Sequence, residues 1–252
     1  MESYIAGSDD VLIDSLNFRP GKSGSFVTES RSVRFPCESA NRFSPTSQRL
    51  LRFRLTSSHW LDPLSVRFSF DVRNLSSSSA NTFLSPKPMA LFQRARIIAG
   101  SVIIDDCDYV GRTVTMLERL KPPGRAMNEV IMGPGAASDS TLSIASGTLD
   151  TILASDARTM CTDLSFMGLF SQHKWIPAGL MGSLVVELEL NSDASYSTTG
   201  SADWIIENPV IFCIEKILDS ALQSRYVEHI MSGKNMPISM SCMATTLHIV
   251  ST

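Results

Sequence analysis

A strict alternation of apolar and polar residues over Leu64–Val72 constrains the fold of this chain more than any other feature. Leu, Val and Phe occupy every second position, and Ser, Arg and Asp occupy the positions between them. A period of two is typical of a β-strand with one buried face. The run Leu51–Leu55 repeats the pattern with arginines at its polar positions. We therefore predict two half-buried strands, joined by a corner at His59–Pro63 where proline stops the first run.

Weaker signals of the same kind predict further strands. Phe92–Asp105 has the pattern of a β-hairpin with its turn at Ala99–Ser101. Alternating or short apolar runs predict the other strands, over Ser32–Phe35, Leu164–Phe170, Ser183–Asn191, Pro209–Ile217 and Ile238–Val250. Residues 124–160 are weakly patterned and rich in Gly, Ser and Ala, so we predict a long loop there.

Two short helices are expected in the connections. The first begins near Val110, with Asp106 or Asp108 as its cap, and ends before Pro122. The second follows Asp219 and ends at Gly233. With about seven or eight strands and no βαβ alternation, the chain is predicted to be all-β: an antiparallel β-sandwich of jelly-roll type with two short helices in its connections.

The domain organisation follows from where these patterns begin. Residues 1–47 are irregular and are predicted to form an extended N-terminal arm or lead-in, and residues 48–252 to form the jelly-roll domain. The chain has no apolar run of membrane-spanning length, and acidic residues near Met1 argue against a secretory signal. Its five scattered cysteines are typical of free thiols in a reducing compartment.

Searches for catalytic and metal-binding motifs argue against an enzyme. Gly21-Lys22-Ser23 resembles the end of a phosphate-binding loop, but Leu16 stands where that loop needs a glycine. Asp106–Gly111 imitates the start of a calcium-binding loop, but Val110 and Leu117 occupy two of its ligand positions. The four histidines are dispersed, which leaves open only a catalytic triad assembled in space. We predict no cofactor and no metal.

Four segments resemble a known family. They are LRFRLTSSHWLDPLSVRFSFDVRN, LFQRARIIAGSVIIDDCDYVGRTVTMLERL, WIPAGLMGSLVVELEL and WIIENPVIFCIEKILDSALQSRYVEHIMSGKNMPI. Together they resemble jelly-roll major capsid proteins of tailless icosahedral DNA viruses, and in particular the first jelly roll of the double-jelly-roll lineage. The resemblance runs from near Leu50 to Ile238. It implies a capsid subunit that forms trimers or larger capsomers, contacts other capsid proteins and resides in the virion, and it implies no catalytic residue. A double jelly roll needs a longer chain, so a single jelly roll, a partial chain and a minor vertex protein remain open.

The charge distribution suggests how such subunits could meet. Residues 1–126 carry a net charge of +5 and residues 127–252 carry −8. We expect basic and acidic faces of neighbouring subunits to oppose one another, with assembly weakened by salt, and an indirect contact of the basic half with the genome. The candidate interface residues are Arg52, Arg54, Arg67, Glu187, Glu189 and Trp175.

Two other classes of function remain as alternatives. A lectin-like or receptor-binding β-sandwich would use exposed aromatic residues such as Tyr196, Trp175 or Trp204. A hydrolase built on a β-scaffold is disfavoured by the failed motif searches.

Overall fold

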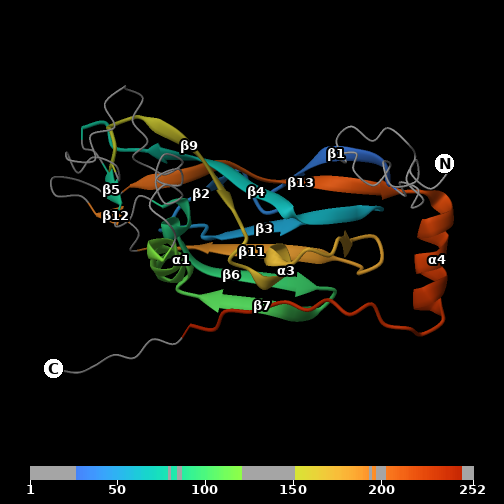
Figure 1. Ribbon diagram of the computed structural model, residues 1–252. Helices are drawn as coiled ribbons and strands as arrows, with labels where there is room; N and C mark the ends of the chain where they lie inside the picture. Colours follow the sequence, from blue (N-terminus) through green and yellow to red (C-terminus); the bar gives the residue numbers. More distant parts are fainter. Residues whose placement is uncertain are drawn as a thin grey trace, which may run out of the picture.

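The computed structural model describes residues 27–78, 81–83, 87–120, 151–192, 195–196 and 203–245. Two antiparallel sheets lie face to face, with helix α1 at one end and helix α4 at the other (Figure 1). The architecture is the β-sandwich of jelly-roll type that the alternating patterns predicted.

One sheet is built around two long central strands. Its order is β1-β13-β4-β10, with β2 beside β13 and β9 beside β4; the strands are β1 (Val27–Pro36), β2 (Arg42–Phe43), β4 (Trp60–Asn74), β9 (Ala157–Asp163), β10 (Ile176–Pro177) and β13 (Trp204–Leu218). The second sheet has the order β3-β11-β6-β7, with strands β3 (Leu50–Arg54), β6 (Phe92–Ala99), β7 (Val102–Asp108) and β11 (Leu184–Leu190).

Smaller elements complete the described parts of the chain. A third sheet has the order β12-β5-β8, from β5 (Asn81–Phe83), β8 (Thr151–Ile152) and β12 (Ser195–Tyr196). The helices are η3 (Pro88–Leu91), α1 (Val110–Arg119), α3 (Gly168–Ser171) and α4 (Ser220–Met231).

The core lies between the two large sheets and contains the apolar residues of the alternating runs, except Leu64, which is exposed at the start of its run. Phe68 of β4 contacts Phe53 of β3 and Phe92 of β6, with ring centroids 5.5 Å apart in both pairs. Phe70 of the same strand stacks on Phe68 at 4.7 Å. All four rings are buried, so aromatic packing across the sandwich joins one sheet to the other.

The corner expected at His59–Pro63 is wrong, because β4 runs through it as one strand from Trp60. The pairing of β4 with β13 is instead interrupted between Asp62 and Arg67. In that gap the Ser65 hydroxyl donates to the Asp62 carbonyl at 2.6 Å and accepts from the Ile214 amide at 2.8 Å. A local irregularity of this kind accommodates Pro63, which has no amide hydrogen to give to a ladder.

Two further segments that we expected to be strands do not form strands in the described residues. Leu164–Phe170 forms a tight turn and the start of α3, and its apolar side chains are buried except Phe166, which is partly buried. Such a short apolar run cannot be distinguished from a strand by its periodicity alone. Within Ile238–Val250, residues 238–245 have no strand pairing and run beside β7 (Figure 1), and residues 246–252 lie outside the described part. Ile238, Met240 and Met243 pack against the core, so side chains and not a backbone ladder hold this segment.

Part of the long loop expected over residues 124–160 is occupied by strands. β8 and the first half of β9 fall inside this range, and residues 121–150 lie outside the described part. β9 pairs with β4 along its whole length, which extends the sheet beyond what its weak apolar pattern indicated.

The helix at residues 220–231 is confirmed in detail, whereas the first helix differs at its start. Asp219 accepts a hydrogen bond from the Ala221 amide at 3.1 Å, and Gly233 follows the helix with φ of 77°. α1 instead follows Tyr109, whose φ is 54°. The carboxylates of Asp106 and Asp108, either of which we expected as its cap, lie 2.8 and 3.2 Å from the Arg94 guanidinium.

The strand expected near Ser32–Phe35 is part of β1, nine of whose ten residues pair with β13. β1 and β2 precede the boundary that we placed at residue 47 and belong to the first sheet. The division into an arm and a jelly-roll domain stays a prediction.

Candidate assembly surface

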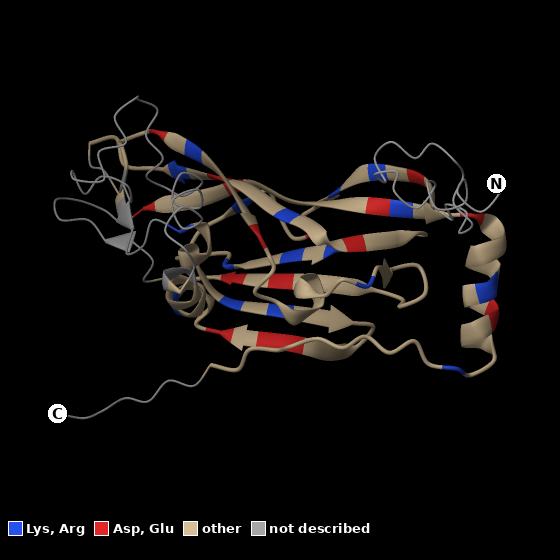
Figure 2. Cartoon of the chain, viewed as in Figure 1, with Lys and Arg blue, Asp and Glu red and all other residues tan. Residues whose placement is uncertain are grey.

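Charged side chains form ordered rows on the outward face of the β3-β11-β6-β7 sheet. Arg52 of β3 pairs in register with Glu187 of β11, Glu187 with Arg96 of β6, and Arg96 with Asp106 of β7. Blue and red bands accordingly alternate on neighbouring strands (Figure 2). Cross-strand neighbours of opposite charge attract each other, so this row stabilises the register of all four strands.

A second row lies one step along the same strands. Arg94 of β6 is opposite Glu189 of β11 and Asp108 of β7. Its guanidinium donates to both oxygens of Asp106, at 2.8 and 2.6 Å, and lies 3.2 Å from Asp108. The hydrogen bonds to Asp106 raise the pKa of Arg94 above its ordinary value, although partial burial acts in the opposite direction.

The glutamates of this face form ion pairs with arginines of the same chain. Glu187 lies 3.7 Å from Arg52 and 3.6 Å from Arg96, and only 8% of its surface is exposed. Glu189 lies 3.4 Å from Arg49. The sequence pattern suggested a solvated or subunit-facing Glu187, but the two arginines cover it because their long side chains fold over the strand between them.

The outward face of the other sheet has its own buried carboxylates. Glu207 of β13 lies 2.8 Å from both Arg42 and Arg73. Glu215 of the same strand accepts hydrogen bonds from Arg31 at 2.6 Å and from Ser57. Burial disfavours the charge of Glu215, but these two hydrogen bonds outweigh it and hold its pKa below the ordinary value.

The lowered pKa of Glu215 predicts a specific loss of stability in acid. Because the folded state holds the carboxylate charged more strongly than the unfolded state does, its stabilisation is complete above the unfolded pKa of about 4.3 and is lost as the pH falls through the lower folded value. We expect Glu215→Gln to lower the free energy of unfolding near pH 7 and to flatten its decline below about pH 4.3. Urea unfolding at a series of pH values measures both effects. Glu29→Gln, at an exposed position of β1, is the control and should leave the profile unchanged; parallel profiles for wild type and Glu215→Gln would contradict the prediction.

The remaining candidate interface residues are separated in space. Arg54 pairs with Glu38 at 2.9 Å, and Arg67 donates to the carbonyls of Leu64 and Val66 at 3.1 and 2.8 Å. Trp175 precedes β10, and the Lys216 ammonium lies 5.9 Å from its ring centroid. The structure therefore brings Arg52, Arg54, Glu187 and Glu189 to the outward face of the β3-β11-β6-β7 sheet and places Arg67 and Trp175 elsewhere.

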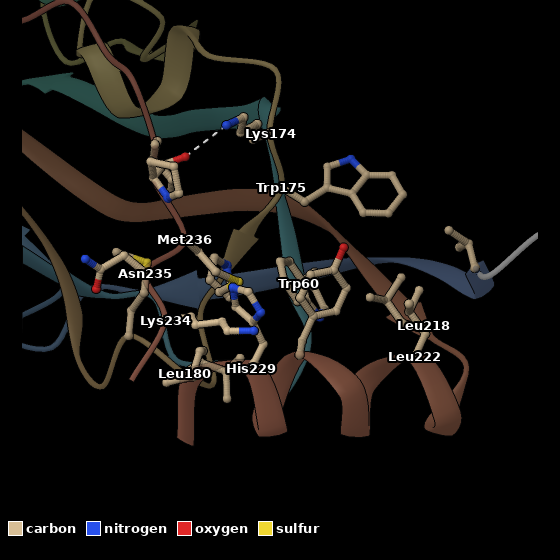
Figure 3. Close-up of a pocket in the computed structure, with 17 residues that line it drawn as sticks. Trp60, Lys174, Trp175, Leu180, Leu218, Leu222, His229, Lys234, Asn235 and Met236 are labelled. Atoms are coloured by element: carbon tan, nitrogen blue, oxygen red, sulfur yellow. Dashed lines mark hydrogen bonds between the residues drawn. The ribbon is translucent and has the colours of Figure 1, made fainter. Parts of the chain in front are cut away.

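A groove beneath α4 was not anticipated from the sequence. It has a volume of about 910 Å³ and lies between α4, the start of β4, the turn around β10 and residues 234–238. Trp60, Trp175, Leu180 and Leu222 are among its walls (Figure 3). Four separate segments meet here, so no local motif could have identified it, although Trp175 had been singled out.

The exposed aromatic residues that a lectin-like module would use are not all available. Trp204 is 1% exposed and opens β13, so it cannot stack on a ligand. Trp60 opens β4 and packs against Tyr226 of α4, with ring centroids 4.9 Å apart. Both tryptophans therefore pack at strand entries.

No cluster of three or more His, Cys, Asp or Glu side chains suited to a metal ion is found among the described residues. The Gly21–Ser23 segment lies outside them. None of the described helices is long and apolar enough to cross a membrane.

The five thiols differ in accessibility, which predicts an order of alkylation. Cys213 is buried, and burial raises its pKa to about 11, whereas Cys242 is exposed. The Cys213 thiol is both covered and mostly protonated at pH 8, so we expect iodoacetamide to modify the exposed Cys242 of the folded chain and to leave Cys213 unmodified. Peptide mass spectrometry measures the order, and a chain unfolded in urea is the control in which all five react. Modification of Cys213 as fast as Cys242 would contradict the burial.

The structure is similar to solved capsid structures. No protein-family model and no curated protein matches the chain. Vp54 of the virus PBCV-1, fitted into a reconstruction of the virophage Sputnik, matches with a TM-score of 0.52 and 13% identity, covering 84% of this chain and 48% of that chain. The Faustovirus major capsid protein matches with a TM-score of 0.51 and 7% identity, covering 90% of this chain and 60% of that chain.

These similarities establish the fold. The PBCV-1 capsid, in a quasi-atomic model, also matches with a TM-score of 0.52 and 14% identity, over 83% of this chain and 47% of that chain. The predicted resemblance to jelly-roll capsid proteins is thus confirmed at the level of the fold. The chain spans about half the length of the PBCV-1 structures that it matches.

Proposed function

We propose that this protein is a structural subunit of an icosahedral viral capsid. The observation that carries the proposal is the match of the two-sheet sandwich, over more than four fifths of this chain, to the capsid structures of PBCV-1 and Faustovirus. The role is structural and not enzymatic: the subunit acts by repeating the same contacts with its neighbours, so modest contacts add up to a stable shell.

The finer parts of the proposal concern partners and chain length. The subunit forms a homotrimer or larger capsomer, contacts other capsid proteins, resides in the virion and meets the genome only indirectly. Since the chain matches about half of the PBCV-1 structures, we propose that the jelly roll is the first of two in a longer polypeptide, with a single jelly roll as the alternative.

The tip of the β6–β7 hairpin is a suitable contact with a neighbouring subunit. Val102 is 63% exposed and Ile103 is 51% exposed, and they are adjacent in β7. Exposed apolar residues that lie together mark interaction sites. Arg67 and Trp175 remain candidate contacts at other points of the surface, and Arg52, Arg54, Glu187 and Glu189 together contribute the outward face of the β3-β11-β6-β7 sheet.

The mass of the purified native protein tests the proposal. Light scattering coupled to size exclusion should give a trimer or a larger particle, and electron microscopy should show capsomers or shells. A stable monomer of 27.6 kDa under all conditions would overturn the proposal and favour the binding-module alternative. Repeating the measurement from low to high salt tests the electrostatic part, which predicts weaker assembly as salt screens the charges.

A pair of matched variants tests the hairpin contact. Val102→Asp with Ile103→Asp should reduce assembly by at least tenfold, about 1.4 kcal/mol for a repeated contact, while the unfolding midpoint of the subunit stays the same. Ser101→Asp adds a charge at the neighbouring turn position and is the control that should assemble normally. Equal assembly of all three proteins would exclude the hairpin tip as a contact.

A further inference from the structure

The groove beneath α4 is apolar and only partly filled. No residue of α4 is buried, although Leu222, Tyr226 and Ile230 all line the groove. On the opposite wall, Trp60 contacts the Tyr226 ring, and Trp175 and Leu180 extend the apolar surface (Figure 3). A helix gains most of its stability in proteins by burying such a face, so the contacts within the described residues leave this helix incompletely packed.

The positive charges of the groove are concentrated toward the C-terminal end of α4. Lys234 lies there, while Leu218 and Leu222 lie toward the other end (Figure 3). Lys174 also lines the groove and donates to the Pro237 carbonyl at 2.9 Å. None of the described residues lining the groove is acidic. The groove therefore suits a segment that combines apolar side chains with negative charge.

The chain itself leads into the groove from its N-terminal side. Val27, the first described residue, is one of the lining residues. α4 has twelve residues and is therefore about 18 Å long. The nine residues from Phe18 to Val27 span up to about 30 Å when extended, so the segment that precedes them can reach any part of the groove.

The sequence of this preceding segment complements the groove. Val11-Leu12-Ile13 and Leu16 are apolar, and Asp9, Asp10 and Asp14 lie between and before them. The chain has no Lys or Arg before Arg19. Counted back from Val27 toward the N-terminus, the glycines at positions 21 and 24 come first, and the apolar residues and the carboxylates follow them. Val27 pairs with Leu218, which lies at the end of the groove opposite Lys234.

We propose that residues 9–18 of the same chain dock in the groove beneath α4, with their apolar side chains against Trp60, Leu222 and Ile230 and their carboxylates near Lys234. A segment tethered at the rim has an effective concentration in the millimolar range, which favours it over the same segment of another copy. The proposal goes beyond the capsid function and does not depend on it.

Photo-cross-linking of the full-length chain tests the docking. Benzoylphenylalanine in place of Leu222, and in a second variant in place of His229, should cross-link to residues 9–18, as read by peptide mass spectrometry. The same probe in place of Val102, at the exposed β6–β7 turn, is the control and should not reach this segment. Mixing chains of light and heavy isotope composition distinguishes a link within one chain from a link between two copies.

Charge variants test the predicted orientation. Lys234→Glu and Asp14→Lys should each lower the yield of the Leu222 cross-link about two- to fivefold, the factor for one exposed ion pair, and their combination should restore it. A cross-link to residues 9–18 of a second copy, to another protein or to other segments of this chain would overturn the proposal. The absence of any cross-link from both probe positions in a folded chain would overturn it as well.

Discussion

Replacing Phe68 by alanine is expected to lower the free energy of unfolding by about 3–5 kcal/mol, the range for removing a large aromatic side chain from a core. The Phe68 side chain is fully buried and contacts rings of both sheets, from Phe53 and Phe92 across the sandwich and from Phe70 beside it. The cavity would open between the two layers, where both sheets are constrained by their own ladders and cannot collapse into it. Urea unfolding followed by tryptophan fluorescence measures the loss.

The same strand provides a matched control. Leu64 also belongs to β4 but is 44% exposed, so Leu64→Ala should change the free energy of unfolding by only about 0.5 kcal/mol. If both variants lost the same stability, the core would not lie where the ring contacts place it. A loss of less than about 1 kcal/mol for Phe68→Ala would show that the sheets close over the cavity.

The sandwich was predictable because its central strands carry their burial pattern in the sequence. In β4 the apolar residues at alternate positions from Val66 to Val72 are buried, and in β3 the same holds for Leu51 and Phe53. Both strands have one face against the core and one face outward, so alternation reports their orientation directly. The N-terminal cap of α4 could also be predicted from the sequence, because the Asp219 carboxylate accepts a hydrogen bond from an amide only two residues away.

The errors occur where contacts between distant segments override the local pattern. Pro63 suggested a stop, but Ser65 bridges Asp62 and Ile214 and lets β4 continue past it. The apolar run after Leu164 suggested a strand, but the Gly168 amide donates to the buried Asp105 carboxylate of β7 at 2.8 Å and the chain turns into α3. Ile214 is 149 residues from Ser65 and Asp105 is 63 residues from Gly168, so neither of these two contacts could be inferred from the local pattern.

The candidate surface likewise combines residues that the sequence identified with contacts that it could not predict. The sequence identified Glu187 and Arg52 as charged residues of two strands, but only the register of β3 with β11 shows that they neutralise each other. Arg96 completes this arrangement from a third strand. The groove beneath α4 required four segments to be placed together, of which Trp175 alone had been noted. The alternation within one strand can be predicted from its own sequence, whereas the contacts that form a surface depend on the register between strands.

Replacing Gly168 by alanine is expected to lower the free energy of unfolding by about 1–3 kcal/mol, the range for an added methyl group in a packed site. A Cβ at this position would lie against the carbonyl oxygen of Ser241 and 2.9 Å from its carbonyl carbon. Neither side can yield easily: the hydrogen bond to Asp105 holds Gly168, and Met240 and Met243 anchor the opposing segment on the core. Urea unfolding measures the loss, and Ser171→Ala, an exposed position of the same short helix, should change stability by about 0.5 kcal/mol or less.

A double-mutant cycle assigns the Gly168→Ala loss to its cause. In a chain that ends after Ile238, the Ser241 carbonyl is absent, so Gly168→Ala should then cost only a few tenths of a kcal/mol. The truncation removes Met240 and Met243 from the core and therefore lowers the free energy of unfolding by itself. This loss cancels, because the cycle compares the effect of Gly168→Ala in the full chain with its effect in the truncated chain. An unchanged loss in the truncated chain would place the strain in α3 itself. A loss that vanishes would show that the segment after α4 packs closely enough on α3 to admit only glycine at residue 168.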